Sequence, residues 1–391
     1  MSKYDICIVG GAGHIGAPLA IIFANKGLKV LIYDLNQKSM DTIANGNLPF
    51  SEKGHEPFLK QALDSKNLFF TNKSYDIKHS DNVVITIGTP VDEFQNPKLQ
   101  EIIKCIDDLP IHSNQLLILR STLFPGTTDY VKRYLEEKNL HPKIAFCPER
   151  IVEGEAFKEM QELPQIISGV DTKSSIAAQV LFNLITPKIV HMKPMEAEFA
   201  KLISNTYRYI QFAAANQFYE MATGAGLSYT NILAGAKQDY ARLRDLPKAG
   251  FAAGPCLLKD TLQLCAFSEG RFPLGHAAVQ ANEGLPAFLV SQLEDKHNLL
   301  TKTVGLLGMA FKANIDDPRT SLSYKLKKIL AFKAKKVLTS DPFVLDPDLL
   351  PIDDVIKASD ILIVCVPHTV YNELHIRFDL KNKEVINIWN D

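Results

Sequence analysis

The first 150 residues alternate short apolar runs with helical stretches. The run Ile6–Val9 precedes a glycine-rich turn and the helical pattern of Ala17–Ala24, and a second run, Lys29–Tyr33, follows that helix. Short apolar runs separated by helical segments are typical of buried parallel strands joined by crossover helices. The pattern therefore predicts an α/β fold with a doubly wound sheet. Further runs of this kind lie at residues 82–90, 116–122 and 143–149.

A much longer helical pattern runs from about Met195 to Ala225 without a proline. At about 1.5 Å per residue this helix would span roughly 40 Å, and helices of that length often join two domains or form the core of a dimer. Lys201 and Asn205 lie four positions apart on it and therefore project from one face. Spacing alone favours an exposed lysine beside a solvated asparagine.

The last ninety residues echo the first ninety. Lys29–Asp34 is matched by Lys336–Asp341, and Asp76–Val84 is matched by Val355–Ile363. Thr303–Gly308 resembles the first strand but lacks its glycine turn, which suggests a second Rossmann-like domain for a different nucleotide-like ligand. The predicted organisation is two such domains joined by a long central helix and a helical middle domain. The expected ranges are 1–195, 196–298 and 299–391.

Composition narrows the possible partners. The chain has 391 residues, of which 46% are hydrophobic and 22% charged, with a net charge of -1. This near-neutral balance argues against nucleic acid or anionic membranes as the main partner. No apolar run reaches about 18 residues and no signal-peptide pattern begins the chain, so a cytoplasmic protein is expected. Six cysteines without CxxC spacing argue against disulfides and a metal site.

The first glycine-rich turn has the spacing of a dinucleotide-binding loop. Gly11, Gly13 and Gly16 satisfy G-x-G-x-x-G between a strand and a helix, and Asp34 ends the second strand. An acid at this position can bind ribose hydroxyls, and the absence of a basic residue directly after it favours NAD over NADP. The alternative is a glycine turn in some other α/β domain.

Three polar side chains fall where predicted strands end. Thr89, Thr122 and Glu149 follow the strand patterns described above. Ligands of parallel sheets bind beyond the carboxyl ends of the strands. Each residue alone is also typical of a capping or solvated position.

One cysteine stands apart from the other five. Cys256 follows the small residues of Ala249–Gly254 and precedes Asp260 by four positions, so a helix starting there would place thiol and carboxylate on one face. A helix start favours a thiolate. We interpret Cys256 as a nucleophile, with a structural loop thiol as the alternative. The pattern predicts inert core positions for Cys7, Cys105, Cys265 and Cys365 and leaves Cys147 ambiguous.

The ordered set of motifs resembles the UDP-glucose/GDP-mannose dehydrogenase family over essentially the whole chain. Members of that family oxidise the C6 alcohol of a nucleotide sugar to a carboxylate with two NAD per turnover. The resemblance also reverses the solvated reading of Lys201 and Asn205. The matching segments are Gly11–Gly16, Gly88–Pro90, Ser121–Thr122, Pro148–Glu149 with Glu153–Gly154, Lys201 with Asn205, Gly250–Asp260, Ala310–Lys312 and Asp317–Arg319.

The resemblance implies a covalent mechanism. A first hydride transfer gives an aldehyde, Cys256 adds to it as a thiohemiacetal, a second transfer gives a thioester, and water hydrolyses it. Lys201 with Asn205 would stabilise the oxyanion. Asp260 would orient the water or act as base, with Thr122 and Glu149 assisting.

The same resemblance assigns binding roles. Arg242 would reach the substrate of a neighbouring subunit, although Arg244 competes for that role. The residues expected to bind NAD are Gly11, Gly13, His14, Ile15, Asp34, Thr89, Ser121, Thr122, Glu153, Lys259 and Arg319. The residues expected to bind the nucleotide sugar are Glu149, Arg150, Lys201, Asn205, Arg242, Phe251, Gly254 and Lys312.

Some positions depart from the family pattern. The family's Gly-Phe-Gly-Gly-Ser-Cys reads Gly250-Phe-Ala-Ala-Gly-Pro-Cys256 here, and His14 replaces an aromatic residue of the glycine loop. Pro148-Glu-Arg150 resembles branches that act on acetamido sugars, so UDP-N-acetylmannosamine is the expected substrate. UDP-N-acetylglucosamine and UDP-glucose are the alternatives.

Other classes stay open on the residues alone. A single-hydride hydroxyacid dehydrogenase would need no thiol, and a non-catalytic NAD-binding regulator would need no catalytic groups. A homodimer or higher homo-oligomer is expected through the middle helices, and uronates of this kind usually serve polysaccharide biosynthesis.

Overall fold

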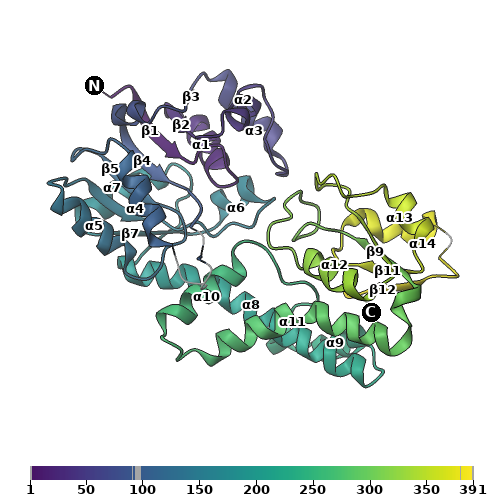
Figure 1. The fold of residues 1–391 in the computed structure, drawn as a ribbon. Helices are drawn as coiled ribbons and strands as arrows, with labels where there is room; N and C mark the ends of the chain where they lie inside the picture. Colours follow the sequence, from purple (N-terminus) through teal and green to yellow (C-terminus); the bar gives the residue numbers. More distant parts are fainter. Residues whose placement is uncertain (1, 90, 93–97, 379, 390–391) are drawn as a thin grey trace. The chain divides into compact units, whose positions relative to one another are not determined.

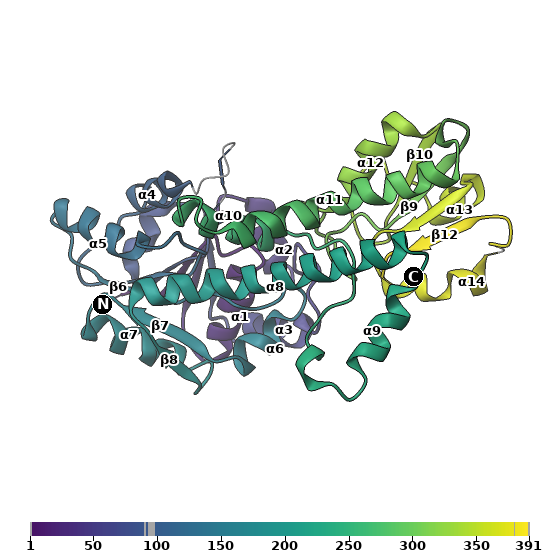
Figure 2. The same cartoon turned by 90° about the horizontal axis from the view of Figure 1, so that it is seen from below.

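The computed structural model describes residues 2–89, 91–92, 98–378 and 380–389. The chain divides into two compact units, Met1–Ile203 and Ser204–Asp391 (Figure 1). The boundary falls inside α8 (Pro194–Gly224), the long helix expected from the sequence, which Figure 2 shows as one unbroken element. The sequence division at residues 195 and 298 stays a prediction, because the structure groups the residues from 204 onward together.

The first unit is built on an eight-stranded sheet with the order β3-β2-β1-β4-β5-β6-β7-β8, in which β6 and β7 alone are antiparallel neighbours among the described strands. The first six strands follow the order of a doubly wound dinucleotide-binding sheet. The strands are β1 (Tyr4–Val9), β2 (Val30–Tyr33), β3 (Leu68–Thr71), β4 (Ser80–Ile85), β5 (Leu116–Leu119), β6 (Lys143–Phe146), β7 (Gln165–Gly169) and β8 (Ile189–His191).

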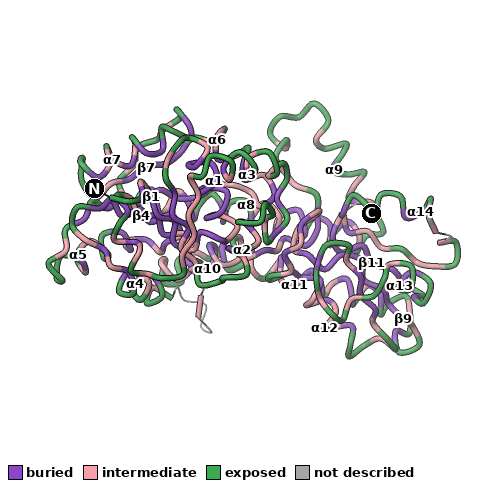
Figure 3. Tube along the Cα trace, turned by 90° about the horizontal axis from the view of Figure 1, so that it is seen from above, coloured by how far each residue is buried: buried purple, intermediate pink, exposed green. Residues whose placement is uncertain are grey.

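Helices cover both faces of this sheet. Ile6 and Ile8 of β1 face one buried cluster, while Cys7 and Val9 face the other. Burial on both sides explains why the strands are continuous apolar runs, and most of β1 and β4 is coloured as buried in Figure 3. The first cluster includes residues of α1 (Gly16–Asn25), α2 (Gln37–Ala44), α3 (His55–Asp64), α6 (Ala156–Glu162) and α7 (Thr172–Phe182). The second includes residues of α4 (Leu99–Asp108), α5 (Thr127–Glu137) and α8.

The second unit combines helices with a four-stranded parallel sheet of order β10-β9-β11-β12. β10 lies beside β9 as β2 lies beside β1, and β11 lies beside β9 as β4 lies beside β1, so the predicted echo is confirmed. The predicted fold class is confirmed as well. The strands are β9 (Thr303–Leu307), β10 (Lys336–Ser340), β11 (Ile361–Val364) and β12 (Glu384–Asn387). The helices are α9 (Tyr229–Lys237), α10 (Leu257–Phe267), α11 (Pro273–Lys296), α12 (Leu322–Lys333), α13 (Ile352–Ala358) and α14 (Leu374–Arg377).

A shared core joins the helices of this unit to its sheet. Leu285 and Leu289 of α11 belong to the same buried cluster as Leu326 of α12 and Val304 of β9. The segment that leads to α10 is part of this cluster through Phe251. Among the helices in the described ranges, none combines the length and the hydropathy that a membrane crossing needs.

Candidate active site

The loop between β1 and α1 has the geometry of a pyrophosphate cradle. A Cβ on Gly11 would lie 2.7 Å from the carbonyl oxygen of Ile8, and one on Gly16 would lie 2.7 Å from the Cα of Gly11. These two glycines therefore allow the tight turn and the close packing of helix on strand. A Cβ on Gly13 would meet nothing closer than 3.5 Å, so the backbone there is open to an approaching ligand.

Asp34 stands at the rim of this loop, directly after β2. Its Oδ2 accepts a hydrogen bond from the backbone N–H of Ala12 at 3.0 Å, and its Oδ1 accepts one from Asn36 at 2.9 Å. The carboxylate is half-buried, and its remaining lone pairs can accept the hydroxyls of a ribose. The glycine loop and Asp34 together fit NAD.

Replacing Asp34 with alanine is expected to raise the KM for NAD by roughly 10- to 150-fold, because a hydrogen bond to a charged group contributes about 1.5–3 kcal/mol. Initial rates at varied NAD measure this change. Asp41→Ala, on the exposed face of α2, is the matched control and should keep the wild-type KM. An unchanged KM in Asp34→Ala would contradict the assignment.

Two predicted NAD-binding residues of the first unit meet at the same rim. Nδ1 of His14 lies 2.8 Å from Oε1 of Glu153, and the imidazole lies against the ring of Phe50 with 4.2 Å between centroids. The carboxylate of Glu52 accepts hydrogen bonds from the backbone N–H groups of Gly154 and Ala156, which fixes the loop that carries Glu153.

The hydroxyls at the ends of β4 and β5 tie neighbouring turns together. Thr89 donates from Oγ1 to the carbonyl of Thr122 at 2.6 Å, and Ser121 donates from Oγ to the carbonyl of Ile87 at 2.6 Å. Contact of these residues with NAD stays a prediction. Pro90, the last residue of the Gly-Thr-Pro turn, lies outside the described residues.

Glu149 is held by a buried arginine that the sequence reasoning missed. The guanidinium of Arg120 pairs with Oε2 of Glu149, and Oε1 accepts the backbone N–H groups of Arg150 and Ile151 at 2.6 and 2.8 Å. Arg120 also donates to Gln165 at 3.0 Å. The available signal was a charged residue inside the apolar run 116–122. Occupation of both oxygens favours an anchored carboxylate, and the predicted catalytic role of Glu149 stays a prediction.

Cys256 lies at the start of α10, as expected. The side chain is exposed, and the carbonyl of Cys256 accepts the backbone N–H of Asp260 at 2.9 Å. Asp260 belongs to the first helical turn. The positive end of the helix is therefore close to the thiol, where it favours the thiolate.

The carboxylate of Asp260 is fully buried and held by α8. Its Oδ2 accepts a hydrogen bond from Nδ2 of Asn205 at 2.6 Å, and Nζ of Lys259 lies 3.7 Å from its Oδ1. Oδ1 is buried and accepts no hydrogen bond from any described residue, so its lone pairs keep their capacity to accept one. Lys201 precedes Asn205 by one turn of α8, and both are less than a tenth exposed, so the solvated alternative for this pair is wrong.

Burial separates the remaining cysteines from Cys256. It raises the pKa of Cys147 to about 12 and that of Cys105 to about 11, in each case mainly because the thiolate would lose its hydration. The pKa values of Cys7, Cys265 and Cys365 are raised for the same reason. The predicted core positions of Cys7, Cys265 and Cys365 are confirmed, and Cys147 is buried as well. Cys105 is half-buried, and the inertness of these thiols stays a prediction.

The loop after β9 carries the predicted groups of the second sheet. It starts at the point where the strand order reverses, since β9 lies between β10 and β11. The backbone N–H of Phe311 donates to the carbonyl of Asp317 at 2.9 Å, and Nε of Arg319 lies 2.8 and 2.9 Å from the two carboxylate oxygens of Asp317. These contacts fix the segment that contains Lys312.

Asp341 ends β10 as Asp34 ends β2, but its carboxylate is occupied by the protein. Oδ2 accepts the backbone N–H groups of Met309 and Ala310 and lies 3.0 Å from Nε2 of His368. Oδ1 accepts two further backbone N–H groups, from Phe343 and Val344. Burial acts to raise the pKa of Asp341, but the hydrogen bond from His368 and the backbone donors outweigh it and lower the pKa to about 2.

Four residues predicted to bind the nucleotide sugar differ in how far they are exposed to solvent. Arg242 is exposed and lies over the ring of Tyr240, while Arg150 donates to the carbonyl of Pro164. Phe251 is buried, and Gly254 adopts a φ of +109°. Their contacts with a nucleotide sugar stay predictions.

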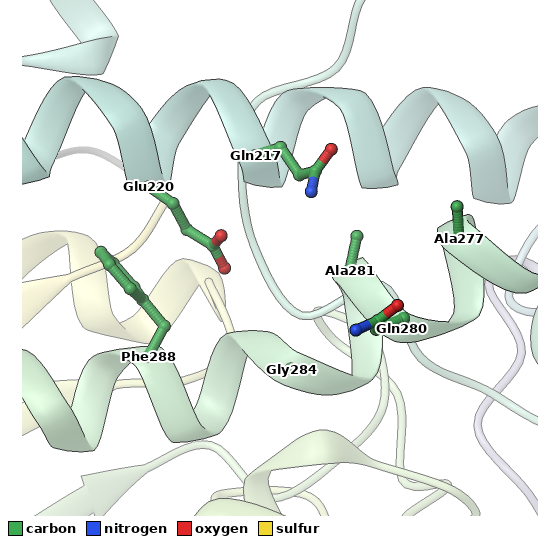
Figure 4. Close-up of a pocket in the computed structure, with 7 residues that line it drawn as sticks. All are labelled: Gln217, Glu220, Ala277, Gln280, Ala281, Gly284 and Phe288. Carbon is green, nitrogen blue, oxygen red and sulfur yellow. The ribbon is translucent and has the colours of Figure 1, made fainter.

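A separate cavity of about 400 Å³ opens between α8 and α11 (Figure 4). Glu220 and Phe288 point into it, and none of the described residues that line it carries a thiol or a cationic group. This cavity therefore lacks the chemistry found at Cys256. Its lining consists of Gln217, Glu220, Ala277, Gln280, Ala281, Gly284 and Phe288.

Three family models match successive parts of the chain, all from the UDP-glucose/GDP-mannose dehydrogenase family. They are its NAD binding domain over residues 4–186, its central domain over 195–284 and its UDP binding domain over 305–390. The sequence is 29% identical to UDP-N-acetyl-D-mannosamine dehydrogenase of Methanocaldococcus jannaschii, covering 96% of this chain and 88% of the relative. It is 27% identical to UDP-glucose 6-dehydrogenase of Rickettsia conorii, covering 96% and 93%.

Solved structures show the same fold. A UDP-D-ManNAc dehydrogenase from Pyrococcus horikoshii matches with a TM-score of 0.90 at 27% identity, covering 98% of this chain and 94% of the other. A UDP-glucose dehydrogenase from Pyrobaculum islandicum matches with a TM-score of 0.89 at 24% identity, covering 100% and 95%, which supports the fold alone.

Proposed function

Because the chain belongs to the UDP-glucose/GDP-mannose dehydrogenase family, we propose that it oxidises the C6 hydroxyl of UDP-N-acetylmannosamine to the uronate. NAD-dependent oxidation of a UDP-sugar is the activity of the chain, and the identity of the sugar is the finer part of the proposal. The alternative is UDP-glucose. The first choice is supported by Arg150 after Pro148-Glu149 and by the similarity to relatives named UDP-N-acetyl-D-mannosamine dehydrogenase.

The observation that carries the mechanism is an exposed thiol, Cys256, at the start of α10, one helical turn before the buried carboxylate of Asp260. When bound, NAD supplies the hydride acceptor for both oxidations. The thiolate of Cys256 adds to the aldehyde carbon, which keeps the aldehyde on the protein and provides a carbon that can lose a second hydride. The positive start of α10 favours that thiolate before the attack.

Asn205 and Lys201 complete this chemistry from α8. The Nδ2 group of Asn205 holds Asp260 and keeps a second N–H that can donate to a developing oxyanion, and the ammonium of Lys201 adds a positive charge. Oδ1 of Asp260, which accepts no hydrogen bond from a described residue, would then accept one from a water molecule that enters the site and attacks the thioester. Attack by water releases the uronate and regenerates the thiol.

Counting NADH per sugar tests this proposal. The protein is incubated with NAD and, separately, with the UDP derivatives of N-acetylmannosamine, N-acetylglucosamine and glucose. We expect two NADH per molecule of UDP-N-acetylmannosamine and the highest kcat/KM for that sugar. One NADH per sugar would support a single-hydride dehydrogenase, and no reaction with any nucleotide sugar would support a non-catalytic NAD-binding protein.

A homodimer through α8 is part of the proposal. Tyr207, Phe218 and Met221 are exposed on this helix at spacings of eleven and three, which place them on one face, and Leu227 and Ile232 beyond its end are exposed as well. Burial of such a stripe by a second copy would be favourable. A cytoplasmic location, which the six scattered cysteines without CxxC spacing support, and a role in polysaccharide biosynthesis also belong to the proposal.

A further inference from the structure

Two aromatic rings press against the two glycines that lead to Cys256. A Cβ on Gly250 would lie 2.5 Å from Cε3 and Cη2 of Trp389, and a Cβ on Gly254 would lie 2.7 Å from Cδ2 of Phe311. Real Cβ atoms do not approach a ring so closely, so each glycine gives its ring a place against the backbone. The segment from 250 to 254 is therefore held at both ends.

Both rings belong to loops of the four-stranded sheet. Phe311 follows β9 and precedes Lys312, while Trp389 follows β12. Nε1 of Trp389 donates to the carbonyl of Cys365 at 2.9 Å, next to β11, which fixes the orientation of the indole relative to the sheet. The sheet that would bind the nucleotide therefore makes direct contact with the approach to the thiol.

Two buried asparagines hold the same segment through hydrogen bonds. The backbone N–H of Gly250 donates to Oδ1 of Asn216 on α8 at 2.8 Å, and Nδ2 of Asn216 donates to Oδ1 of Asn282 on α11 at 2.9 Å. Asn282 in turn donates to the carbonyl of Tyr209 at 2.9 Å. The position of Gly250 is therefore fixed by the hydrogen bond to Asn216 and by the contact with the ring of Trp389.

We propose that Trp389 and Phe311 are positioning residues for Cys256, which set the place of the thiol relative to the nucleotide-sugar-binding sheet. This inference rests on the proposed covalent role of Cys256. Without a ring, the glycine beside it gains access to many backbone conformations, and the segment loses a packing partner. A displacement of about 1 Å at a reacting group can cost roughly 100-fold in rate.

Counting products separates this role from a general loss of structure. The first oxidation does not use the thiol, whereas the second does. In Trp389→Leu we expect the NADH count to fall from two toward one per sugar consumed, with free aldehyde that a hydrazine reagent traps, and kcat to fall about 10- to 100-fold. Trp389→Phe, which keeps a ring at this position, should restore most of the count. A partly unfolded preparation would be slower but would still give two NADH per sugar.

Phe311→Leu is expected to show the same fall, and Phe332→Leu is its matched control because Phe332 is 89% exposed on α12. Should Trp389→Leu fail to fold, Gly250→Ala adds one methyl group where the indole lies and should give the same signature. Two NADH per sugar with wild-type kcat in these variants would overturn the proposal.

Amide hydrogen exchange tests the positioning without any turnover. Trp389→Leu should increase exchange in peptides covering residues 249–256 while leaving peptides of β9 and α12 unchanged. Unchanged exchange in 249–256 would overturn the positioning role. A wild-type protein that gives fewer than two NADH per sugar would instead overturn the proposed function.

Discussion

Replacing Cys256 with serine is expected to abolish steady-state turnover, with a loss in kcat of at least about 1,000-fold. A serine hydroxyl is almost entirely protonated at neutral pH, and the start of α10 cannot ionise it as it can a thiol. The aldehyde would then not be captured. A single-turnover experiment with enzyme in excess should give at most one NADH per sugar.

The matched control for this variant is Cys105→Ser. Cys105 lies half-buried on α4 in the first unit, and its thiol has a raised pKa, so the substitution should leave kcat and the NADH count at wild-type values. Wild-type steady-state rates in Cys256→Ser would contradict the thioester mechanism.

Replacing Asp260 with asparagine is expected to slow thioester hydrolysis by roughly 10²- to 10⁴-fold, the usual contribution of a general base. The amide keeps the shape of the side chain but cannot take a proton from water. Because capture by Cys256 stays intact, the enzyme should give a burst of two NADH per active site followed by slow turnover. Intact-protein mass spectrometry should detect the acylated chain.

Asp295→Asn is the matched control for that experiment, since Asp295 is an exposed carboxylate on α11. It should show no burst and no adduct. If Asp260→Asn turns over like the wild type, or stops before a second NADH forms, the carboxylate does not serve the hydrolytic step.

The first sheet could be read from the sequence because each of its inner strands is buried on both faces. Ile8 and Val9 face opposite clusters, and such strands leave continuous apolar runs. Gly11 and Asp34 identify the loop because the tight turn at Gly11 excludes a side chain and the ribose requires an acidic residue at the end of β2. The pairing of β6 with β7 could not be read in this way, since a short run such as Gln165–Gly169 carries no information on its direction.

Apart from the family resemblance, the contacts within the site were predictable only between residues that are close in the chain. Cys256 and Asp260 lie four residues apart at the start of one helix, and this spacing defines their relation. Asn205 meets Asp260 through the packing of two distant helices, and Trp389 reaches Gly250 from the far end of the chain. No local pattern encodes such contacts. The role of Arg120 was not predicted for a different reason. It follows the apolar residues of β5, and this pattern indicates a strand without indicating an ion pair with Glu149.

The five hydrogen-bond donors around Asp341 prevent the second sheet from binding a dinucleotide in the way that the first sheet does. Its topology repeats that of the first, so restoring a glycine-rich loop after β9 looks like a short route to a second dinucleotide site. In such a site the carboxylate of Asp341 would have to accept the ribose hydroxyls. Its oxygens, however, already accept hydrogen bonds from Met309, Ala310, Phe343, Val344 and His368. A second dinucleotide site would therefore first require the loss of these buried hydrogen bonds to Asp341. The same requirement applies to protein engineering and to natural evolution.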